Sequence, residues 1–131
     1  MVDSYAWIEL FLGSPKGKRV REIIEGAESV YTPDTVLAEL SRKYLRENVP
    51  EKEVRERLAV VEGASHILLI TLDLAVSASR AYSELLERAK KKRVTLPGLF
   101  DGIVLGATRL KKAKVVTGDP HFKELPETIW I

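Results

Sequence analysis

The chain has 131 residues, among them 21 lysines and arginines, 19 aspartates and glutamates, two histidines and no cysteine. This length suits one domain with its own core. The lack of cysteine excludes disulfides, thiolate metal sites and cysteine nucleophiles. A formal net charge of +2 is too small to indicate a nucleic-acid-binding protein by itself.

We do not expect the N-terminal segment to be a signal peptide or a membrane anchor. Asp3 and Glu9 lie where a signal peptide would be basic and then apolar, and no apolar run reaches the length of a membrane span. We therefore expect one domain over residues 1–131, located in the cytoplasm and without a membrane partner.

Strands and helices alternate through the first half of the chain. Polar caps, prolines and glycines mark the helix ends, and apolar residues recur at helical spacing between them. In chain order we predict a strand at 1–3, a helix capped by Ser4, a helix from Ser14 and Pro15 to Gly26, a strand at 29–31, and a helix from Thr32 and Pro33 to about Asn48.

The second half continues the alternation, and its apolar run at 67–70 is typical of a strand covered on both faces. Strands alternating with helices predict a three-layer α/β/α sandwich with a mostly parallel central sheet. We predict a helix from Pro50 to Gly63, a strand at 67–70, a helix from Thr71 or Asp73 to about 93, a helix from about Asp101 to 113, a strand at 115–116, and a final strand within 125–131.

Two aspartates follow predicted strands. Asp3 ends the first strand, and Asp119 follows Val115 and Val116 within the segment VVTGDPHF. Open parallel sheets bind ligands beyond the carboxyl ends of their strands, so these two carboxylates are expected to meet at one edge of the sheet. Each aspartate alone is explained equally well as a turn or helix-capping residue.

Two further acids lie on predicted helices. Glu39 is at the edge of an apolar stripe, where a half-solvated surface position is the simpler explanation. Asp101 begins a helix that is apolar nearly all round, although an acid in a first turn is also favoured by the helix dipole. Gly102 and Gly106 each lower the helix propensity by about 1 kcal/mol relative to alanine, which predicts the close approach of a neighbouring element.

Carboxylates brought within a few ångströms repel one another unless they are protonated or share a cation. Mg²⁺ or Mn²⁺ is the expected ion, because both accept oxygen ligands and lower the pKa of a bound water beside a phosphate. A site of soft transition-metal ligands is not expected, since the chain has only His66 and His121. We expect His66 to be structural and His121 to be a surface turn residue within reach of a phosphate.

Four segments together carry a family resemblance. They are Asp3-Ser4 after a strand, TPDTVLAEL with Glu39, FDGIVLGATRL with Asp101, and TGDPHF with Asp119. In order and spacing they resemble the four acidic motifs of a PIN domain across nearly the whole chain, and the length is similar to that of VapC-type toxins. The resemblance implies a Mg²⁺- or Mn²⁺-dependent endoribonuclease with Asp3, Glu39 and Asp101 as central acids and Asp119 as a more variable fourth.

The same resemblance implies supporting roles and a substrate. Ser4 and Thr117 would hold carboxylates or waters in place. A metal-activated water would attack the phosphodiester of single-stranded or loop RNA in line. Basic residues beside the groove would hold the RNA backbone, with these candidates: Lys90 to Arg93, Arg109, Lys111 and Lys112.

The resemblance to VapC-type toxins also implies a homodimer and a small protein antitoxin as partner. One alternative is a PIN nuclease of RNA processing without a toxin role, which the absence of a neighbouring antitoxin reading frame would favour. Another is a catalytically silent module that binds RNA or protein, although the presence of all four acids argues against it. A haloacid-dehalogenase-like phosphatase is excluded, because it needs an aspartate two residues after Asp3, where this chain has Tyr5.

Overall fold

Short parallel strands form the centre of the molecule. The computed structural model describes residues 1–131, with strands β1 (Tyr31–Pro33), β2 (His66–Leu68), β3 (Val115–Thr117) and β4 (Thr128–Trp130). Strand β1 pairs in parallel with β2, and β3 pairs in parallel with β4, with Thr32 opposite Ile67 and Val116 opposite Ile129.

Val2 joins the two strand pairs. It forms a parallel bridge with Val116 of β3, and its N–H donates to the carbonyl of Tyr31 in β1 at 2.9 Å. The strand predicted at 1–3 is therefore a single bridging residue in the middle of the order β2, β1, Val2, β3, β4. The N-terminal ammonium adds a hydrogen bond to the carbonyl of Lys114 at 2.7 Å.

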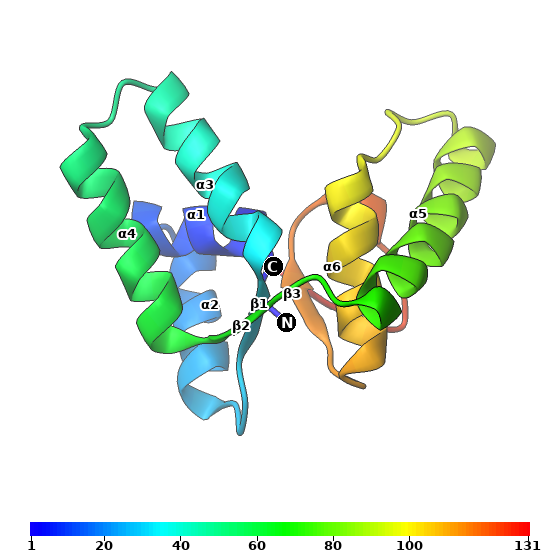
Figure 1. Ribbon diagram of the computed structural model, residues 1–131, viewed down its shortest axis with the longest axis horizontal. Helices are drawn as coiled ribbons and strands as arrows, with labels where there is room; N and C mark the ends of the chain where they lie inside the picture. The colour runs from blue at the N-terminus through cyan, green and yellow to red at the C-terminus, as the bar shows by residue number, and fades with distance from the viewer.

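Helices cover both faces of these strands, which confirms the predicted α/β sandwich. In Figure 1, one group of helices lies to the left of the strands and α5 and α6 lie to the right, while both chain ends lie near the centre. None of the helices is both long and apolar enough to cross a membrane. The left-hand group comprises α1 (Ser4–Leu12), α2 (Pro15–Gly26), α3 (Asp34–Arg46) and α4 (Glu51–Ala64), and the right-hand pair comprises α5 (Leu72–Lys92) and α6 (Leu99–Leu110).

The first helix begins one residue earlier than the sequence pattern predicts. Asp3, not Ser4, is the N-cap of α1, and its Oδ1 accepts a hydrogen bond from the N–H of Ala6 at 2.8 Å. Both residue types cap helices well, so the local sequence does not distinguish them. The choice matters, because it fixes the Asp3 carboxylate at the junction between the sheet and α1.

The strand predicted at 67–70 is shorter and more exposed than its apolar run suggests. It comprises His66–Leu68, and Leu69 and Ile70 beyond it are 68% and 48% exposed. The prediction that this strand is covered on both faces was therefore wrong. The reason is its position, since β2 lies at the edge of the sheet and pairs only with β1.

Helices α5 and α6 pack so closely at two glycines of α6 that a side chain at either position would clash with α5. A Cβ added to Gly102 would lie 2.6 Å from Cβ of Tyr82, and one added to Gly106 would lie 2.7 Å from the backbone nitrogen of Ala78. The predicted close approach to this glycine pair is confirmed. It brings α6 against α5 on one side while α6 also contacts β1 and β3 on the other.

Candidate metal centre

The four predicted acids come from four separate segments that meet at one edge of the sheet. Asp3 follows the Val2 bridge, Glu39 is in the second turn of α3 after β1, Asp101 is in the first turn of α6, and Asp119 follows β3. Three of them therefore follow the carboxyl end of a strand. In Figure 1 this edge lies between the first turns of α3 and α6.

Asp3 is the most buried of the four, with 5% of its surface exposed. Burial raises the pKa of its carboxyl group to about 7, although hydrogen bonds from the Thr117 hydroxyl and from the Ala6 N–H act in the opposite direction. The nearby carboxylates of Asp119 and Glu39 raise it further. The Thr117 hydroxyl also accepts the N–H of Asp119 at 2.9 Å, so Thr117 ties two of the acids together.

Glu39 faces the same cluster from α3. Burial raises the pKa of its carboxyl group, a hydrogen bond from the Ser4 hydroxyl lowers it, and the carboxylates of Asp101 and Asp119 raise it. Ser4 is the first residue of α1, next to Asp3. Ser4 and Thr117 thus each hold one carboxylate of the cluster.

Asp101 and Asp119 lie close together and share a third group, His121. Burial raises the pKa of the Asp101 carboxyl group, and a hydrogen bond from the Gly98 N–H at 2.7 Å lowers it. Single ligand atoms of Asp101, Asp119 and His121 lie within 4.8 Å of one another. Asp3 and Glu39 lie outside this group of three, although their charges interact with it.

His121 is not the surface turn residue that the sequence suggested. Its side chain is only 15% exposed, and its Nδ1 lies 2.9 Å from Oδ1 of Asp119 and 4.0 Å from Oδ2 of Asp101. Asp119 also caps the short 3-10 helix Pro120–Phe122, accepting the backbone N–H of His121 at 2.8 Å. The signal for this residue was its spacing, because an aspartate in a turn commonly accepts the backbone N–H two residues on, which brings His121 next to Asp119.

The donor set fits a divalent cation. Three carboxyl groups, those of Asp3, Glu39 and Asp101, have raised pKa values, because each is at least partly buried and each is close to another carboxylate. Such a cluster gains more from a shared cation than an exposed set of acids would. The Nδ1 of His121 is buried without a hydrogen bond, which leaves an unsatisfied donor or acceptor facing the same space.

Basic side chains of α3 lie beside Glu39. A hollow of about 250 Å³ is lined by Ser4, Ile8, Glu39, Arg42, Lys43 and Arg46. Arg42 and Arg46 are exposed and lie one and two turns beyond Glu39, while Lys43 pairs with Glu47. The sequence had pointed only to basic clusters later in the chain.

The basic clusters later in the chain lie at different places relative to the acids. Arg109 is held by Glu84 and Glu127, each at 2.7 Å, so it contacts RNA only if those ion pairs break. Lys111 and Lys112 precede β3 and lie near its amino end, whereas Asp119 follows its carboxyl end. The block Lys90 to Arg93 ends α5 beside the loop to Asp101, and its Lys92 pairs with Glu124.

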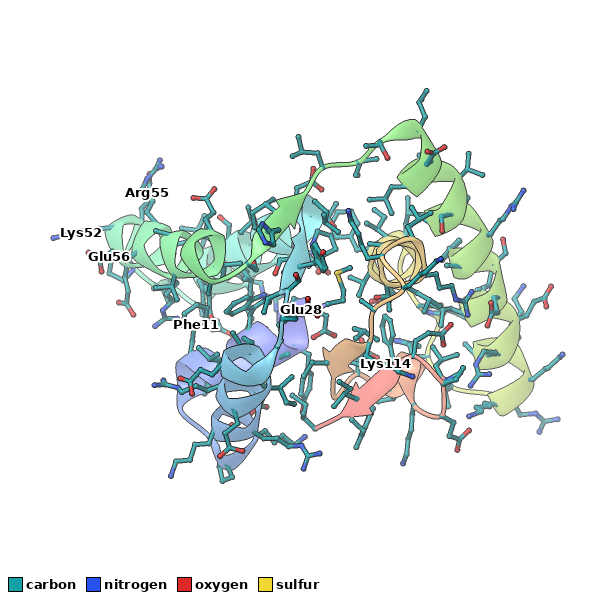
Figure 2. All side chains as sticks on the ribbon, turned by 90° about the horizontal axis from the view of Figure 1, so that it is seen from below. Phe11, Glu28, Lys52, Arg55, Glu56 and Lys114 are labelled. Carbon is teal, nitrogen blue, oxygen red and sulfur yellow. The ribbon has the colours of Figure 1, made fainter.

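A larger hollow of about 480 Å³ lies near that amino end of β3. Glu28 and Lys114 line it together with apolar residues such as Ile24 and Ile129. Figure 2 views the molecule from below and shows Glu28 and Lys114 around the centre of this face. Glu28 is the only carboxylate among its lining residues, so this hollow has no cluster that would bind a metal.

Residues 1–128 match the family described as PIN domain. The chain belongs to the PIN domain family. Two solved structures are similar: a chain of a toxin–antitoxin complex from Klebsiella pneumoniae (17% identity, TM-score 0.68, covering 98% of this chain and 93% of that one) and one of VapBC2 from Rickettsia felis bound to a promoter DNA fragment (17% identity, TM-score 0.66, covering 100% and 96%). Comparison with the curated proteins gave no match.

Membership of the PIN family confirms the resemblance that was based on the four acidic segments. At 17% identity, the two solved structures show a shared fold and nothing finer. PIN domains are typically nucleases that use divalent metals, and the acids of this PIN domain gather where such an ion would bind.

Proposed function

We propose that this PIN domain is a metal-dependent endoribonuclease that hydrolyses RNA phosphodiester bonds, and that it is the toxin of a toxin–antitoxin pair. The observation that carries the nuclease assignment is the convergence of Asp3, Glu39, Asp101 and Asp119 from four segments of a PIN fold. Burial and mutual repulsion keep the pKa of three of these groups raised, as expected of acids arranged for a cation.

In this proposal the four acids hold Mg²⁺ or Mn²⁺, and Ser4 and Thr117 fix the carboxylates to which they are bonded. A bound divalent ion supplies a Lewis acid that lowers the pKa of a water molecule and screens charge on the scissile phosphate. The chain supplies orientation: Thr117 joins Asp3 to Asp119, and Ser4 holds Glu39. These contacts limit the rotation of the Asp3 and Glu39 carboxylates, which keeps that part of the donor set preorganised.

Arg42 and Arg46 are proposed to hold the RNA backbone. Both are exposed and line the hollow that Glu39 also lines, so a phosphate there lies beside the acids. Cations at this position offset the repulsion that four carboxylates exert on an incoming polyanion. Lys90, Lys91 and Arg93 at the end of α5 are further candidates on the same edge.

The toxin role and its partners are the less direct part of the proposal. Their support is that both similar solved structures come from complexes described as toxin–antitoxin or VapBC. We propose by the same likeness a small protein antitoxin, a homodimer and action in the cytoplasm. A small reading frame beside the gene separates this role from that of an RNA-processing nuclease.

The test of the nuclease proposal is cleavage of a structured RNA by the purified protein. We expect cleavage with Mg²⁺ or Mn²⁺, none with EDTA, and a loss of at least about a hundredfold in Asp101→Asn, because removal of one charge-stabilising group costs this much in comparable sites. Asparagine keeps an oxygen that accepts the Gly98 N–H, so the fold of α6 is preserved.

The matched control is Asp73→Asn, which removes the same charge from an exposed first turn in α5. It should cleave as the wild type does. Unchanged cleavage by Asp101→Asn, with contaminating nuclease excluded, contradicts the role of Asp101. Full activity of the wild type in EDTA contradicts metal dependence.

A further inference from the structure

The ring of His121 is held in a single orientation by two contacts. Its Nε2 lies 2.8 Å from the carbonyl oxygen of Thr95, and its Nδ1 lies 2.9 Å from Oδ1 of Asp119. A carbonyl oxygen can only accept a hydrogen bond, so Nε2 carries a proton and donates it. In the neutral ring, Nδ1 is then left with its lone pair directed at the carboxylate.

In the neutral ring, the Nδ1 acceptor therefore faces the Oδ1 acceptor of Asp119. Nδ1 is buried and makes no hydrogen bond, because its 2.9 Å approach to Asp119 lacks hydrogen-bond geometry. Oδ1 of Asp119 already accepts the backbone N–H of His121, and Oδ2 of Asp101 lies 4.0 Å from Nδ1. A lone pair and two carboxylates facing one space repel unless Nδ1 takes up a proton or a metal cation is placed among them.

We propose that Nδ1 of His121 is a ligand of the metal ion, together with Asp101 and Asp119, and that the mixed donor set favours Mn²⁺ over Mg²⁺. This inference rests on the metal-dependent function proposed above and adds a nitrogen ligand to its oxygen site. The three ligand atoms lie within 4.8 Å of one another, so small rotations bring them to one ion.

Two chemical arguments support this assignment. Histidine ligands characteristically donate their second ring N–H to a backbone carbonyl or carboxylate, as Nε2 does to Thr95, and this contact fixes which nitrogen faces the metal. An imidazole nitrogen is also a better ligand for first-row transition ions than for Mg²⁺, which prefers oxygen donors and water. A metal ion bound by Nδ1 of His121 would also lie close to Oδ1 of Asp119.

The test is pulsed electron paramagnetic resonance of Mn²⁺ bound to the full chain, combined with calorimetric titration of Mn²⁺ and Mg²⁺. We expect the wild type to show the modulation of a directly bound imidazole nitrogen. We expect His121→Gln to lose that modulation and to lower Mn²⁺ affinity by about tenfold or more, with a smaller effect on Mg²⁺. Circular dichroism reports whether the variant is folded.

The chain offers an exact control, because its only other histidine, His66, is exposed in the edge strand β2. His66→Gln should keep both the nitrogen modulation and the affinity. Mn²⁺ bound without a nitrogen signal, or a signal that persists in His121→Gln, overturns the inference but leaves the proposed nuclease intact. Failure of the wild type to bind Mn²⁺ or Mg²⁺ at all overturns both.

Discussion

Asp3 combines a structural and an electrostatic role in one side chain. Its Oδ1 caps α1 through the N–H of Ala6, while burial raises the pKa of its carboxyl group to about 7. The cap and the Thr117 hydroxyl hold the carboxylate at the cluster, but they do not fully offset the loss of water around its charge. Without a cation, Asp3 in the folded protein is therefore mostly protonated below about pH 7.

This raised pKa predicts a pH dependence of stability in the metal-free protein. Between pH about 4 and about 7 the folded state binds the Asp3 proton and the unfolded state does not, so the free energy of unfolding falls as the pH rises through this window. The contribution is up to about 1.4 kcal/mol for each pH unit. Asp3→Asn should flatten the curve, because asparagine also caps helices and does not ionise.

Urea denaturation in EDTA at several pH values measures this slope. Asp73→Asn on the exposed start of α5 serves as the control and should keep the wild-type slope. An equal slope in Asp3→Asn and wild type would show that burial of the Asp3 charge does not govern the pH dependence.

At the scale of elements, the α5–α6 pair positions half of the candidate metal centre. Asp101 lies in the first turn of α6, and the loop between the helices supplies the Thr95 carbonyl that contacts His121. Gly102 and Gly106 allow the backbone of α6 to approach α5 so closely that a side chain would not fit between them. The position of Asp101 therefore depends on two residues that have no side chain. Their low helix propensity is offset by this packing.

Gly106→Ala should therefore be strongly destabilising. The added Cβ would lie 2.7 Å and 2.8 Å from the backbone N and Cα of Ala78, and backbone atoms of a packed helix cannot move aside singly. We expect the free energy of unfolding to fall by about 1–3 kcal/mol, as for other overpacked interiors. Thermal or urea unfolding measures this loss.

Gly63→Ala provides the comparison within a helix, because a Cβ added to Gly63 in α4 meets nothing within 4 Å. That substitution should be neutral or stabilise the protein by up to about 1 kcal/mol through helix propensity. Equal effects of the two substitutions would mean that α5 and α6 do not approach as closely as described.

At the scale of the whole molecule, the distribution of charge matters more than the net charge of +2. The acids occupy one edge of the sheet, with Arg42 and Arg46 beside them, whereas Lys111, Lys112 and Lys114 surround the hollow at the other edge. In the proposed function, an RNA strand at the acids lies beside these two arginines, and its affinity should depend on salt through them.

The double variant Arg42→Ala/Arg46→Ala should weaken binding of single-stranded RNA. Fluorescence anisotropy in EDTA at several salt concentrations should show the slope of log affinity against log salt reduced by about one for each arginine that contacts a phosphate. Lys52→Ala/Arg55→Ala removes the same charge from the outer end of α4, shown at the far left of Figure 2, and should change little. Equal losses would indicate that only the net charge matters.

Much of this molecule is determined by local sequence. The alternation of helices and strands, the glycine pair at Gly102 and Gly106, and the order of the four acidic segments all follow from spacing and residue type, which act over a few residues. These features were sufficient to predict the α/β sandwich and the PIN family. Helix ends were less certain, as at Asp3 and Ser4, because neighbouring residues compete for the same cap.

Other features depend on contacts between distant segments, and only the tertiary structure decides them. The exposure of Leu69 follows from the edge position of β2, and the pairing of Arg109 with Glu84 and Glu127 joins three separate elements. The His121 ring is oriented only when the loop before α6 supplies the carbonyl of Thr95. Local sequence determines which side chains are available. Long-range packing determines which of them share a site, because their burial and the charges near them come from neighbours that folding brings together.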